Sequence, residues 1–357
     1  MKILQVITSL ATGGAEMLVT ELSVLLRQRG HDVDVALFKG GPSPMKDKLI
    51  DAGCKVFEFG NSYYNPLYVL KLQRLMRKYD IVHTHNSSPQ MYAAMAAVLC
   101  SVELCSTEHN TSNRKRGWKW YAPVDHWMYN RYRTLICISN QAETNLKAYL
   151  KTCRAHIVTI PNGVNIERFR TAQPIADLKT HPGRFVTVMV AGFRYQKDQE
   201  TLIRAIARLP EAQHELWLVG DGERRPILEA LIKELGVEDR VRLLGIRRDI
   251  PEILHTADAV CMSSHFEGLS LSSIEGMCVG KPFIASDVDG LHEITEGAGL
   301  LFPHGDDEAL AAILDKLAAD ADYRKAVADS CYSRACQYDI QKTVEGYEGV
   351  YADLMRR

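Results

Sequence analysis

The amino-acid sequence predicts an α/β fold built from two doubly wound domains, each a parallel sheet with helices on both faces. The chain has 357 residues, which is more than one ordinary hydrophobic core accommodates, so two domains are expected. Strand-like and helix-like apolar patterns alternate along most of the chain, as in doubly wound sheets. The alternation is interrupted between Asn162 and Gly183, where prolines and glycines cluster. We therefore expect one domain over 1–170 and a second over 171–339, with a linker in this interval.

The composition is that of a soluble globular protein, with 46% hydrophobic residues, 24% charged residues and a net charge of -1. Because there is no basic excess, a nucleic-acid partner is not expected. The nine cysteines form no C-x-x-C pair, which favours reduced thiols in a cytoplasmic protein. The opening residues, MKILQVITSL, read directly as a strand. The most apolar helix-like run, residues 91–102, is far shorter than the ~20 residues of a membrane span. We therefore expect neither a leader peptide nor a membrane span.

The first domain is expected to begin with the apolar strand Lys2–Thr8, a turn-rich loop and an amphipathic helix. Leu18, Leu22, Leu25 and Leu26 fall on one face of that helix. Further strands are expected at Val33–Phe38, Lys55–Phe59, Ile81–Thr84, Val102–Thr107, Leu135–Ser139 and Ile157–Ile160. Helices are expected at Glu16–Arg29, Pro66–Lys78, Pro89–Cys100 and Gln141–Leu150.

The same alternation resumes after the interruption. Strands are expected at Phe185–Ala191, Glu215–Val219, Val241–Leu244, Asp258–Met262 and Phe283–Ala285. Helices are expected at Thr201–Arg208, Arg224–Leu235, Ile250–His255 and Ser270–Cys278. Helices then continue from Asp307 to the end of the chain, and the last of them, Gln341–Met355, carries apolar and aromatic residues at helical spacing.

The stretch from Ser263 to Glu293 holds the strongest functional signal. A loop that follows a buried strand leads into a helix, and such a helix N-terminus carries unsatisfied amides and partial positive charge that bind phosphate. Two carboxylates, Glu267 and Glu275, frame the start of this helix with seven residues between them. A nucleoside diphosphate sugar fits, because it is anionic in the middle and rich in hydroxyls at both ends. The amides expected to face it are those of Gly268, Leu269, Ser270 and Leu271.

On spacing alone an alternative is equally favoured, in which Glu267 caps the helix and Glu275 is solvated. The residue types around the two glutamates favour the first interpretation. EGLSLSSIEGM, followed by GKPFIASDVDGLHEI, resembles the signature of glycosyltransferase family 4, a large retaining family with the GT-B fold. The shared pattern is two glutamates with seven residues between them, then G-x-P, a strand and a G-x-x-E loop. The resemblance covers nearly the whole chain.

The resemblance implies a GT-B fold, in which two Rossmann-like domains face each other across a cleft. It implies that the final helix, about 340–357, returns to the first domain, the acceptor side, and that the second domain holds the donor. The implied activity is retaining transfer of a sugar from a UDP- or GDP-linked donor to a hydroxyl of a glycan or lipid-linked acceptor, in cell-envelope polysaccharide or glycolipid synthesis. A nucleotide-sugar epimerase of the same architecture and a non-catalytic nucleotide-sugar binding protein remain alternatives.

Several residue roles follow from the resemblance. Glu275 would hold the ribose, and Glu267 would orient hydroxyls of the sugar ring. Lys197 lies in QKDQETLIRA, which resembles the family's phosphate motif, and would neutralise the departing diphosphate. The commonest form of this motif has an arginine five residues before the lysine, where this chain has Gly192. The second cation is therefore assigned to Arg194, which resembles a known variant.

Glycines, a hydrophobic residue and a histidine complete the expected site. Gly13 and Gly14 would let the backbone approach the donor closely, with a plain tight turn as the alternative. Gly220 would either bring backbone near the ligand or serve a structural turn. Ile246 lies in a loop that resembles the one that meets the nucleobase in the family. His109 matches the family's N-domain histidine, although an isolated histidine is usually structural.

No metal ion, and no cofactor beyond the nucleotide-sugar co-substrate, is expected. His83 and His85 have strand-like spacing and no accompanying carboxylate pair, which argues against a metal site. Two D-x-D sequences, at 32–34 and 287–289, have the form of the metal motif of the other glycosyltransferase fold. They lie within or at the end of strands, so we interpret them as chance matches.

The segment 113–133 mixes cations with tryptophans and tyrosines. Such a segment suits either peripheral membrane contact or a pocket for an anionic lipid-linked acceptor. A solvated helix with a packed aromatic face explains it equally well. The expected location is the cytoplasm, at the inner face of the membrane if the first interpretation holds.

Overall fold

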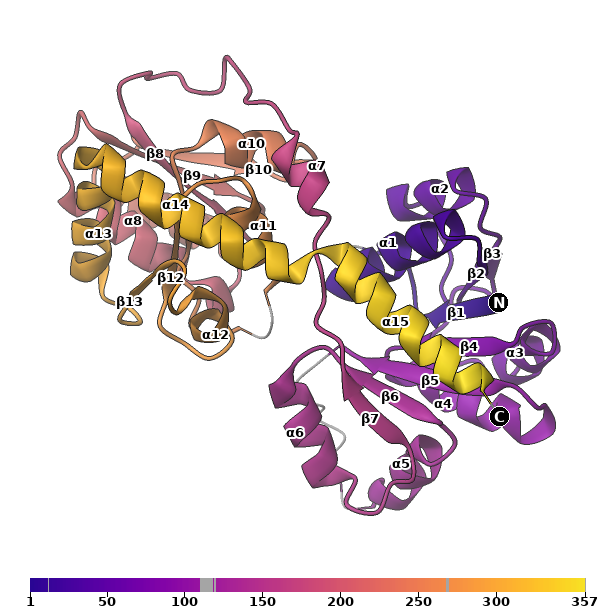
Figure 1. Ribbon diagram of the computed structural model, residues 1–357. Helices are drawn as coiled ribbons and strands as arrows, with labels where there is room; N and C mark the ends of the chain where they lie inside the picture. Colours follow the sequence, from indigo (N-terminus) through magenta and orange to yellow (C-terminus); the bar gives the residue numbers. More distant parts are fainter. Residues whose placement is uncertain (12, 110–117, 119, 268–269, 357) are drawn as a thin grey trace. The chain divides into compact units, whose positions relative to one another are not determined.

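The computed structural model, shown in Figure 1, describes residues 1–11, 13–109, 118, 120–267 and 270–356. The chain divides into two compact units. Unit 1 comprises Met1–Gly163 and Ile340–Arg357, and unit 2 comprises Val164–Asp339. Of the helices described, none is both long enough and apolar enough to cross a membrane.

Among the described residues of unit 1, seven parallel strands form one sheet, in the order β3-β2-β1-β4-β5-β6-β7. The strands are β1 (Lys2–Ile7), β2 (Asp32–Leu37), β3 (Val56–Glu58), β4 (Ile81–His85), β5 (Glu103–Glu108), β6 (Thr134–Cys137) and β7 (His156–Thr159). Ile3 pairs with Val33 on one side and Ile81 on the other. Ile3 and Leu4 are both buried but belong to different core clusters, because successive side chains point to opposite faces.

Helices cover both faces of this sheet. They are α1 (Gly14–Gln28), α2 (Pro44–Asp51), α3 (Tyr68–Met76), α4 (Ser87–Ala96), η1 (Ala97–Leu99), α5 (Ala122–Tyr129), α6 (Asn140–Tyr149) and α15 (Ile340–Met355). α1 and α15 share one core cluster with Ile3, whereas α3, α4, α5 and α6 pack on the opposite face with Leu4. The C-terminal helix α15 buries Val344, Tyr347 and Tyr351 against unit 1 because these residues recur at helical spacing.

In the part of unit 2 that the structure describes, six parallel strands form a second sheet, in the order β10-β9-β8-β11-β12-β13. The strands are β8 (Phe185–Val190), β9 (His214–Val219), β10 (Val241–Gly245), β11 (Ala259–Met262), β12 (Phe283–Ser286) and β13 (Leu300–Phe302). The helices are α7 (Ile166–Arg170), η3 (Tyr195–Lys197), α8 (Gln199–Arg208), α9 (Arg225–Glu234), α10 (Ile250–Thr256), α11 (Leu271–Cys278), α12 (Leu291–Thr295), α13 (Asp307–Ala319), α14 (Ala321–Ala335) and η4 (Cys336–Tyr338).

The interval interpreted as a linker, Asn162–Gly183, is mostly folded into unit 2. It contains α7, whose Ile166 and Phe169 are buried in the core of unit 2, and Leu178 is buried there as well. The unit boundary therefore falls at Gly163 and Val164, before α7, instead of after residue 170. Clustered prolines and glycines indicate turns, but they do not reveal which core the apolar residues between them join.

Both sheets have a point at which the strand order reverses, and ligands of doubly wound sheets bind outside the carboxyl ends of the strands at such points. The reversal lies between β1 and β4 in unit 1 and between β8 and β11 in unit 2. Two non-glycine residues with positive φ, Asn86 at 73° and Asp198 at 48°, lie in loops that follow β4 and β8. Such strained backbone is concentrated at functional sites in proteins. The loops that follow β4 and β8 are therefore candidate locations for a functional site.

Candidate active site

The loops that follow β8 and β11 meet at the switch point of unit 2, where Lys197 pairs with Glu267. Lys197 Nζ donates to Glu267 Oε1, and Ser264 Oγ donates to the same oxygen at 2.9 Å. The two charged side chains are 19% and 8% exposed, so the pair is largely shielded from water. These residues are 70 positions apart in the sequence and are brought together by the adjacency of β8 and β11.

Hydrogen bonds fix the two loops against each other. Ser263 Oγ donates to Asp198 O at 2.7 Å, and the His265 amide donates to Gln196 O at 2.8 Å. Gln196 Nε2 in turn donates to Phe266 O at 2.9 Å. These contacts hold the backbone on both sides of the Lys197–Glu267 pair, so the pair is built into the fold.

The helix start predicted to bind phosphate is α11. Ser270 is its N-cap and makes no side-chain capping bond, and Leu271 is its first residue. The expected donors Gly268 and Leu269 lie outside the described residues. Glu267 bonds to Lys197 and Ser264, which gives its carboxylate a role other than capping this helix. The N-terminus of α11 begins a few residues beyond Glu267, and the free amides of a helix N-terminus favour an anion.

Glu275 lies one turn inside α11 and is mostly buried. Burial raises the pKa of its carboxyl to about 7, and the positive charge of Arg168 on α7 opposes this rise. The described residues supply no hydrogen bond to the carboxylate. A buried carboxyl without partners is costly, so this position is suited to accept hydrogen bonds from hydroxyls of a ligand.

Arg194 is exposed, and within the described chain its guanidinium makes no ion pair. Its side chain turns back over Gly192: Nε lies 3.7 Å from the point where a side chain of Gly192 would begin. In the commonest form of the phosphate motif the arginine stands at position 192. The side chain of Arg194 lies next to that position. The assignment of the second cation to Arg194 stays a prediction.

Gly220 and Ile246 lie at the ends of the neighbouring strands β9 and β10. A Cβ on Gly220 would lie 2.1 Å from the carbonyl oxygen of Ala191, so only glycine fits between these loops. This close contact explains in structural terms why residue 220 is a glycine. Ile246 is 82% exposed, which leaves a hydrophobic side chain and its backbone open to a flat ligand group.

Asp198, His265 and His304 form a cluster next to the Lys197–Glu267 pair that could hold a metal ion, because one ligand atom of each lies within 4.8 Å of the others. Each of these atoms already has a protein neighbour. His265 Nδ1 lies 2.6 Å from His304 Nε2, and Asp198 Oδ2 accepts from Thr201 Oγ1 at 2.6 Å. These hydrogen bonds link the three side chains to neighbouring protein groups, and the absence of a metal ion stays a prediction.

The two D-x-D sequences also have structural partners. Asp32 pairs with Arg27 at 2.8 Å, and Asp34 accepts from Tyr79 Oη at 2.7 Å. Asp287 lies 2.6 Å from His292 Nδ1. These carboxylates are therefore engaged by neighbouring protein groups.

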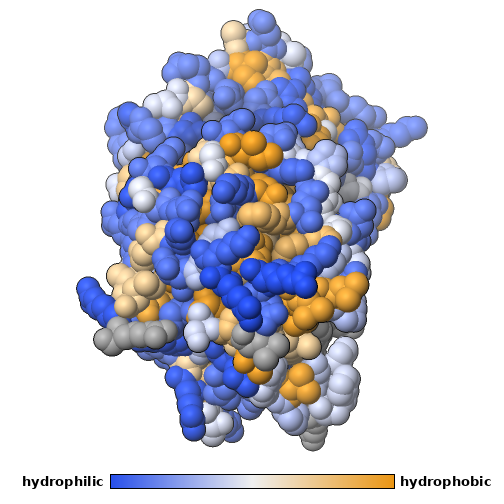
Figure 2. Space-filling model, turned by 90° about the vertical axis from the view of Figure 1, so that its right-hand side faces the viewer, coloured by the Kyte–Doolittle hydropathy of each residue, from blue (hydrophilic) through white to orange (hydrophobic). Residues whose placement is uncertain are grey.

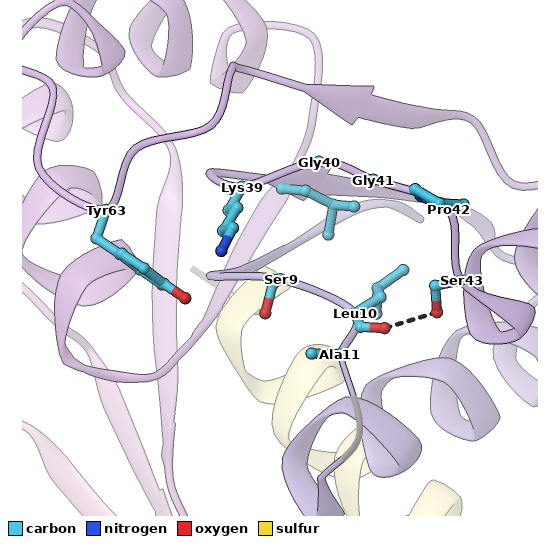
Figure 3. Close-up of a pocket in the computed structure, with 10 residues that line it drawn as sticks. Ser9, Leu10, Ala11, Lys39, Gly40, Gly41, Pro42, Ser43 and Tyr63 are labelled. Atoms are coloured by element: carbon cyan, nitrogen blue, oxygen red, sulfur yellow. Dashed lines mark hydrogen bonds between the residues drawn. The ribbon is translucent and has the colours of Figure 1, made fainter.

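In unit 1 the predicted glycines lie at the start of α1. Gly13 is the N-cap, with extended backbone, and Gly14 is the exposed first residue of the helix. A pocket of about 130 Å³ lies nearby, at the carboxyl ends of β1 and β2, and its lining residues are drawn in Figure 3. It is lined by Ser9, Leu10, Ala11, Leu37, Lys39, Gly40, Gly41, Pro42, Ser43 and Tyr63. Lys39 Nζ lies 5.4 Å from the centroid of the Tyr63 ring, so the pocket offers a cation and an aromatic surface to a polar ligand.

His109 follows β5 and contacts His85, the last residue of β4. His109 Nε2 lies 2.9 Å from His85 Nδ1. Burial lowers the pKa of His109 to about 4 and that of His83 to about 3, so both imidazoles are neutral near pH 7. His83 contacts Tyr351 and Thr107, and His85 contacts Gln5 and His109, so both histidines of the H-T-H sequence are hydrogen-bonded within the core.

The segment 113–133 is only partly described, because residues 113–117 and 119 lie outside the described residues. Its described remainder includes α5, and Trp118 and Trp120 before this helix and Trp127 within it expose 47%, 74% and 38% of their surface. Helix α4, which packs against α5, exposes Met95, and α3, which packs against α4, exposes Leu70. Figure 2 shows apolar side chains at the surface between hydrophilic ones on one face of the molecule.

The chain is similar to known proteins over most of its length. The family model "Glycosyltransferase Family 4" matches residues 12–168, and the model "Glycosyl transferases group 1" matches residues 174–334. The putative glycosyltransferase EpsD of Bacillus subtilis is 29% identical over 299 residues, which cover 78% of this chain and 77% of that protein. A UDP-Gal:alpha-D-GlcNAc-diphosphoundecaprenol alpha-1,3-galactosyltransferase of Escherichia coli is 27% identical over 80% of this chain and 79% of its own.

Solved structures give the same result. Alr3699/HepE of Anabaena in complex with UDP superimposes with a TM-score of 0.86 at 25% identity, covering 99% of this chain and all of that chain. A further structure of that protein holds UDP-glucose. Together with the two family models, which account for most of the sequence, these matches show that the chain is a glycosyltransferase with the GT-B fold and belongs to glycosyltransferase family 4.

Proposed function

We propose that this enzyme moves a sugar from a nucleotide diphosphate sugar to a hydroxyl acceptor with retention of configuration at the anomeric carbon. The observation that carries the proposal is the grouping of Lys197, Glu267, the α11 N-terminus and Glu275 at the switch point of unit 2. This grouping offers a cation and free amides to a diphosphate, between two carboxylates that accept hydrogen bonds from hydroxyls.

Each group has a distinct proposed role. Glu275 accepts hydrogen bonds from the ribose, and Glu267 accepts them from the sugar ring. The N-terminal amides of α11, including Ser270 and Leu271 and the undescribed Gly268 and Leu269, bind the diphosphate. Lys197 and Arg194 stabilise the negative charge that grows on the diphosphate as it departs. In retaining transfer on a single face, the leaving phosphate accepts the acceptor's proton, so no separate general base is required.

The nucleotide proposed first is uridine diphosphate. HepE has been solved with UDP and with UDP-glucose, and the Escherichia coli relative uses UDP-Gal according to its name. The exposed Ile246 and its loop would meet the base. Gly13, Gly14, Gly220 and His109 are proposed as further donor contacts because of their match to the family pattern. A guanine nucleotide is the alternative, and thermal-shift measurements with UDP and GDP separate the two.

The role of Glu275 predicts that donor binding depends on pH. Because burial raises the pKa of this carboxyl to about 7, lowering the pH protonates it and removes an acceptor for the ribose. The diphosphate of the donor stays ionised over this range, so the donor itself does not titrate. Affinity for UDP-glucose is therefore expected to rise between about pH 6 and about pH 8 and then to level off.

Isothermal titration calorimetry at several pH values measures this effect. In the Glu275→Gln variant, affinity should be lower at pH 8 and should no longer change through this range. A pH dependence that survives in the variant would show that another group is responsible, and the ribose assignment would then be wrong.

We also propose that the reaction needs no divalent metal ion. Lys197, Arg194 and the amides of α11 supply the positive charge that neutralises the diphosphate. They thereby take the role that a metal ion usually has. Turnover is expected to stay within about twofold after treatment with EDTA. Loss of activity that magnesium or manganese restores would contradict the proposal, and the Asp198–His265–His304 cluster would then be the first site to mutate.

The acceptor is proposed to be a glycan or lipid-linked glycan of a cell-envelope polysaccharide, reached at the cytoplasmic surface of a membrane. Supporting observations are the diphosphoundecaprenol-linked substrate in a relative's name and the exposed tryptophans at and before α5. All nine cysteines lie within the described residues and form no disulfide bond there, which fits a reducing compartment.

Membrane contact predicts that the protein sediments with liposomes that contain anionic phospholipid. Trp120→Ser should reduce the bound fraction, whereas Ile227→Ser, a change at an exposed apolar residue of unit 2, should not. Binding should also fall when four cations are reversed, namely Arg114, Lys115, Arg116 and Lys119. If the wild-type protein does not sediment with these vesicles, membrane contact through 113–133 is excluded.

A further inference from the structure

A buried chain of hydrogen bonds connects His109 with the C-terminal helix of unit 1. His109 Nε2 lies 2.9 Å from His85 Nδ1, and His85 Nε2 lies 2.8 Å from Gln5 Oε1. Gln5 Nε2 donates to Tyr351 Oη at 3.1 Å. The chain thus runs from the loop after β5 across β4 and β1 to α15.

The chain continues inside the core. Tyr351 Oη lies 2.7 Å from His83 Nδ1, and His83 Nε2 lies 2.8 Å from Thr107 Oγ1. Thr107 Oγ1 is 3.1 Å from Tyr347 Oη on α15. Gln5, His83 and His85 have no exposed surface, although all three are polar residues in the central strands β1 and β4. Buried polar groups are costly unless they are fully bonded, so a complete network at this depth constrains the orientation of every member.

The orientation of Gln5 sets the direction of the protons. Its Oε1 faces His85 and can only accept, so His85 Nε2 carries the proton and donates it. A neutral imidazole has one donor and one acceptor, so His85 Nδ1 is then an acceptor. His109 Nε2 must therefore donate to His85, and His109 Nδ1 is left with a lone pair.

The opposite direction is disfavoured at the His109 end. Reversing the amide of Gln5 would reverse each proton and place one on His109 Nδ1. This atom is buried and has no hydrogen-bond partner among the described residues. A buried N–H without an acceptor is rare in folded proteins, whereas a bare acceptor is better tolerated and can still take an incoming hydroxyl.

We propose that Gln5, His85 and Tyr351 are positioning residues that hold His109 in the Nε2–H tautomer, so that its Nδ1 accepts a hydrogen bond from a hydroxyl of the bound sugar. This inference rests on the proposed function for the identity of the ligand, but not for the tautomer. The proposal gives α15 a role in the site. The hydroxyl of Tyr351 on α15 accepts a hydrogen bond from the side-chain amide of Gln5, and this amide orients the imidazoles of His85 and His109.

The ionisation states agree with this arrangement. Burial lowers the pKa of His109 to about 4 and holds the pKa of His85 well below its usual value. Neither ring is an imidazolium near pH 7, so each carries a single ring proton. The tautomer is then the remaining variable, and the hydrogen-bond chain determines it.

Nitrogen NMR of the full chain tests the tautomer directly. With ¹⁵N-histidine labelling, and with the His109→Phe variant to assign the signals, His109 should show a non-protonated Nδ1 and a protonated Nε2 at pH 7. Gln5→Leu and Tyr351→Phe should produce a mixture of tautomers. Gln5→Glu should retain the wild-type pattern, because a carboxyl oxygen still accepts from His85 Nε2.

Tyr347→Phe is the matched control, since it removes a buried hydroxyl from the same helix at the far end of the chain. It should leave the His109 signals unchanged. A proton on His109 Nδ1 in the wild-type protein would overturn the proposal, and so would an unchanged tautomer in both Gln5→Leu and Tyr351→Phe. The wild-type spectrum decides the first point even if a variant fails to fold.

Kinetics test the ligand half of the proposal. For the nucleotide-sugar donor, kcat/KM should fall about fivefold to tenfold in Gln5→Leu and recover in Gln5→Glu, as expected for the loss and return of one hydrogen bond. Affinity for UDP, which lacks the sugar, should be the same in all of these variants. If His109→Phe leaves kcat/KM unchanged while the wild-type tautomer is as stated, the sugar contact is refuted and the positioning network stands.

Discussion

Replacing Lys197 with methionine is expected to lower kcat by about a hundredfold to a thousandfold, with a much smaller change in KM for the donor. Lys197 lies at the carboxyl edge of β8 with its ammonium shielded from water, where a fixed charge acts strongly on the departing diphosphate. The charge on that group is greatest in the transition state, so the loss appears in kcat more than in binding. Methionine keeps the length of the side chain and removes only the charge.

Single-turnover kinetics with UDP-glucose and a suitable acceptor measure the effect. Lys179→Met is the matched control, because Lys179 Nζ also pairs with a carboxylate of unit 2, Asp258 Oδ2 at 2.6 Å, with 24% of its side chain exposed. Asp258 precedes β11 and therefore lies at the opposite edge of the sheet from Glu267. The control should keep wild-type kcat. If both variants behave alike, the effect reflects stability and Lys197 has no special role.

The architecture was predictable because it follows from periodicity. Alternating apolar runs predicted most strands and helices, and their order predicted two parallel sheets. Short elements escaped prediction: β13 has three residues, and α7 and α12 have five each. A helix of five residues is too short to show a helical period, so tertiary packing decides the structure of α7 and α12.

The candidate site was predictable where one motif holds its residues together. Glu267, Ser270, Leu271 and Glu275 fall within a single stretch, so their common location follows from local structure. The pairing of Lys197 with Glu267 required the strand order, because β8 and β11 are distant in sequence and adjacent in the sheet. Ser264, which also bonds to Glu267, could not be identified beforehand because serines are common in loops.

Gln5 and His85 are polar residues whose positions in strands indicate buried contacts. Gln5 is a polar residue in the otherwise apolar strand β1, and His85 ends a strand of mixed character. A buried polar residue in a core strand indicates a bonded network. Its partner Tyr351 lies 346 residues away, so the sequence alone could not show what Gln5 contacts.

Replacing Glu267 with glutamine is expected to lower kcat/KM for the donor by about a hundredfold. The carboxylate is proposed to accept hydrogen bonds from the sugar ring, and bonds to a charged acceptor contribute about 1.5–3 kcal/mol, which an amide does not match. The same change removes the charged partner of Lys197. Part of the loss is therefore indirect, since the ammonium is no longer held in place.

The double variant Lys197→Met/Glu267→Gln separates the direct part from the indirect part. Because the two side chains are in contact, the loss of kcat/KM in the double variant should be much smaller than the product of the single losses. Urea unfolding should show the same coupling. Glu267→Gln alone leaves a shielded ammonium without its carboxylate, so it should lower the free energy of unfolding more than the double variant does. Strictly additive effects in both measurements would mean that the two residues act independently, and the paired site at the β8–β11 switch point would lose its basis.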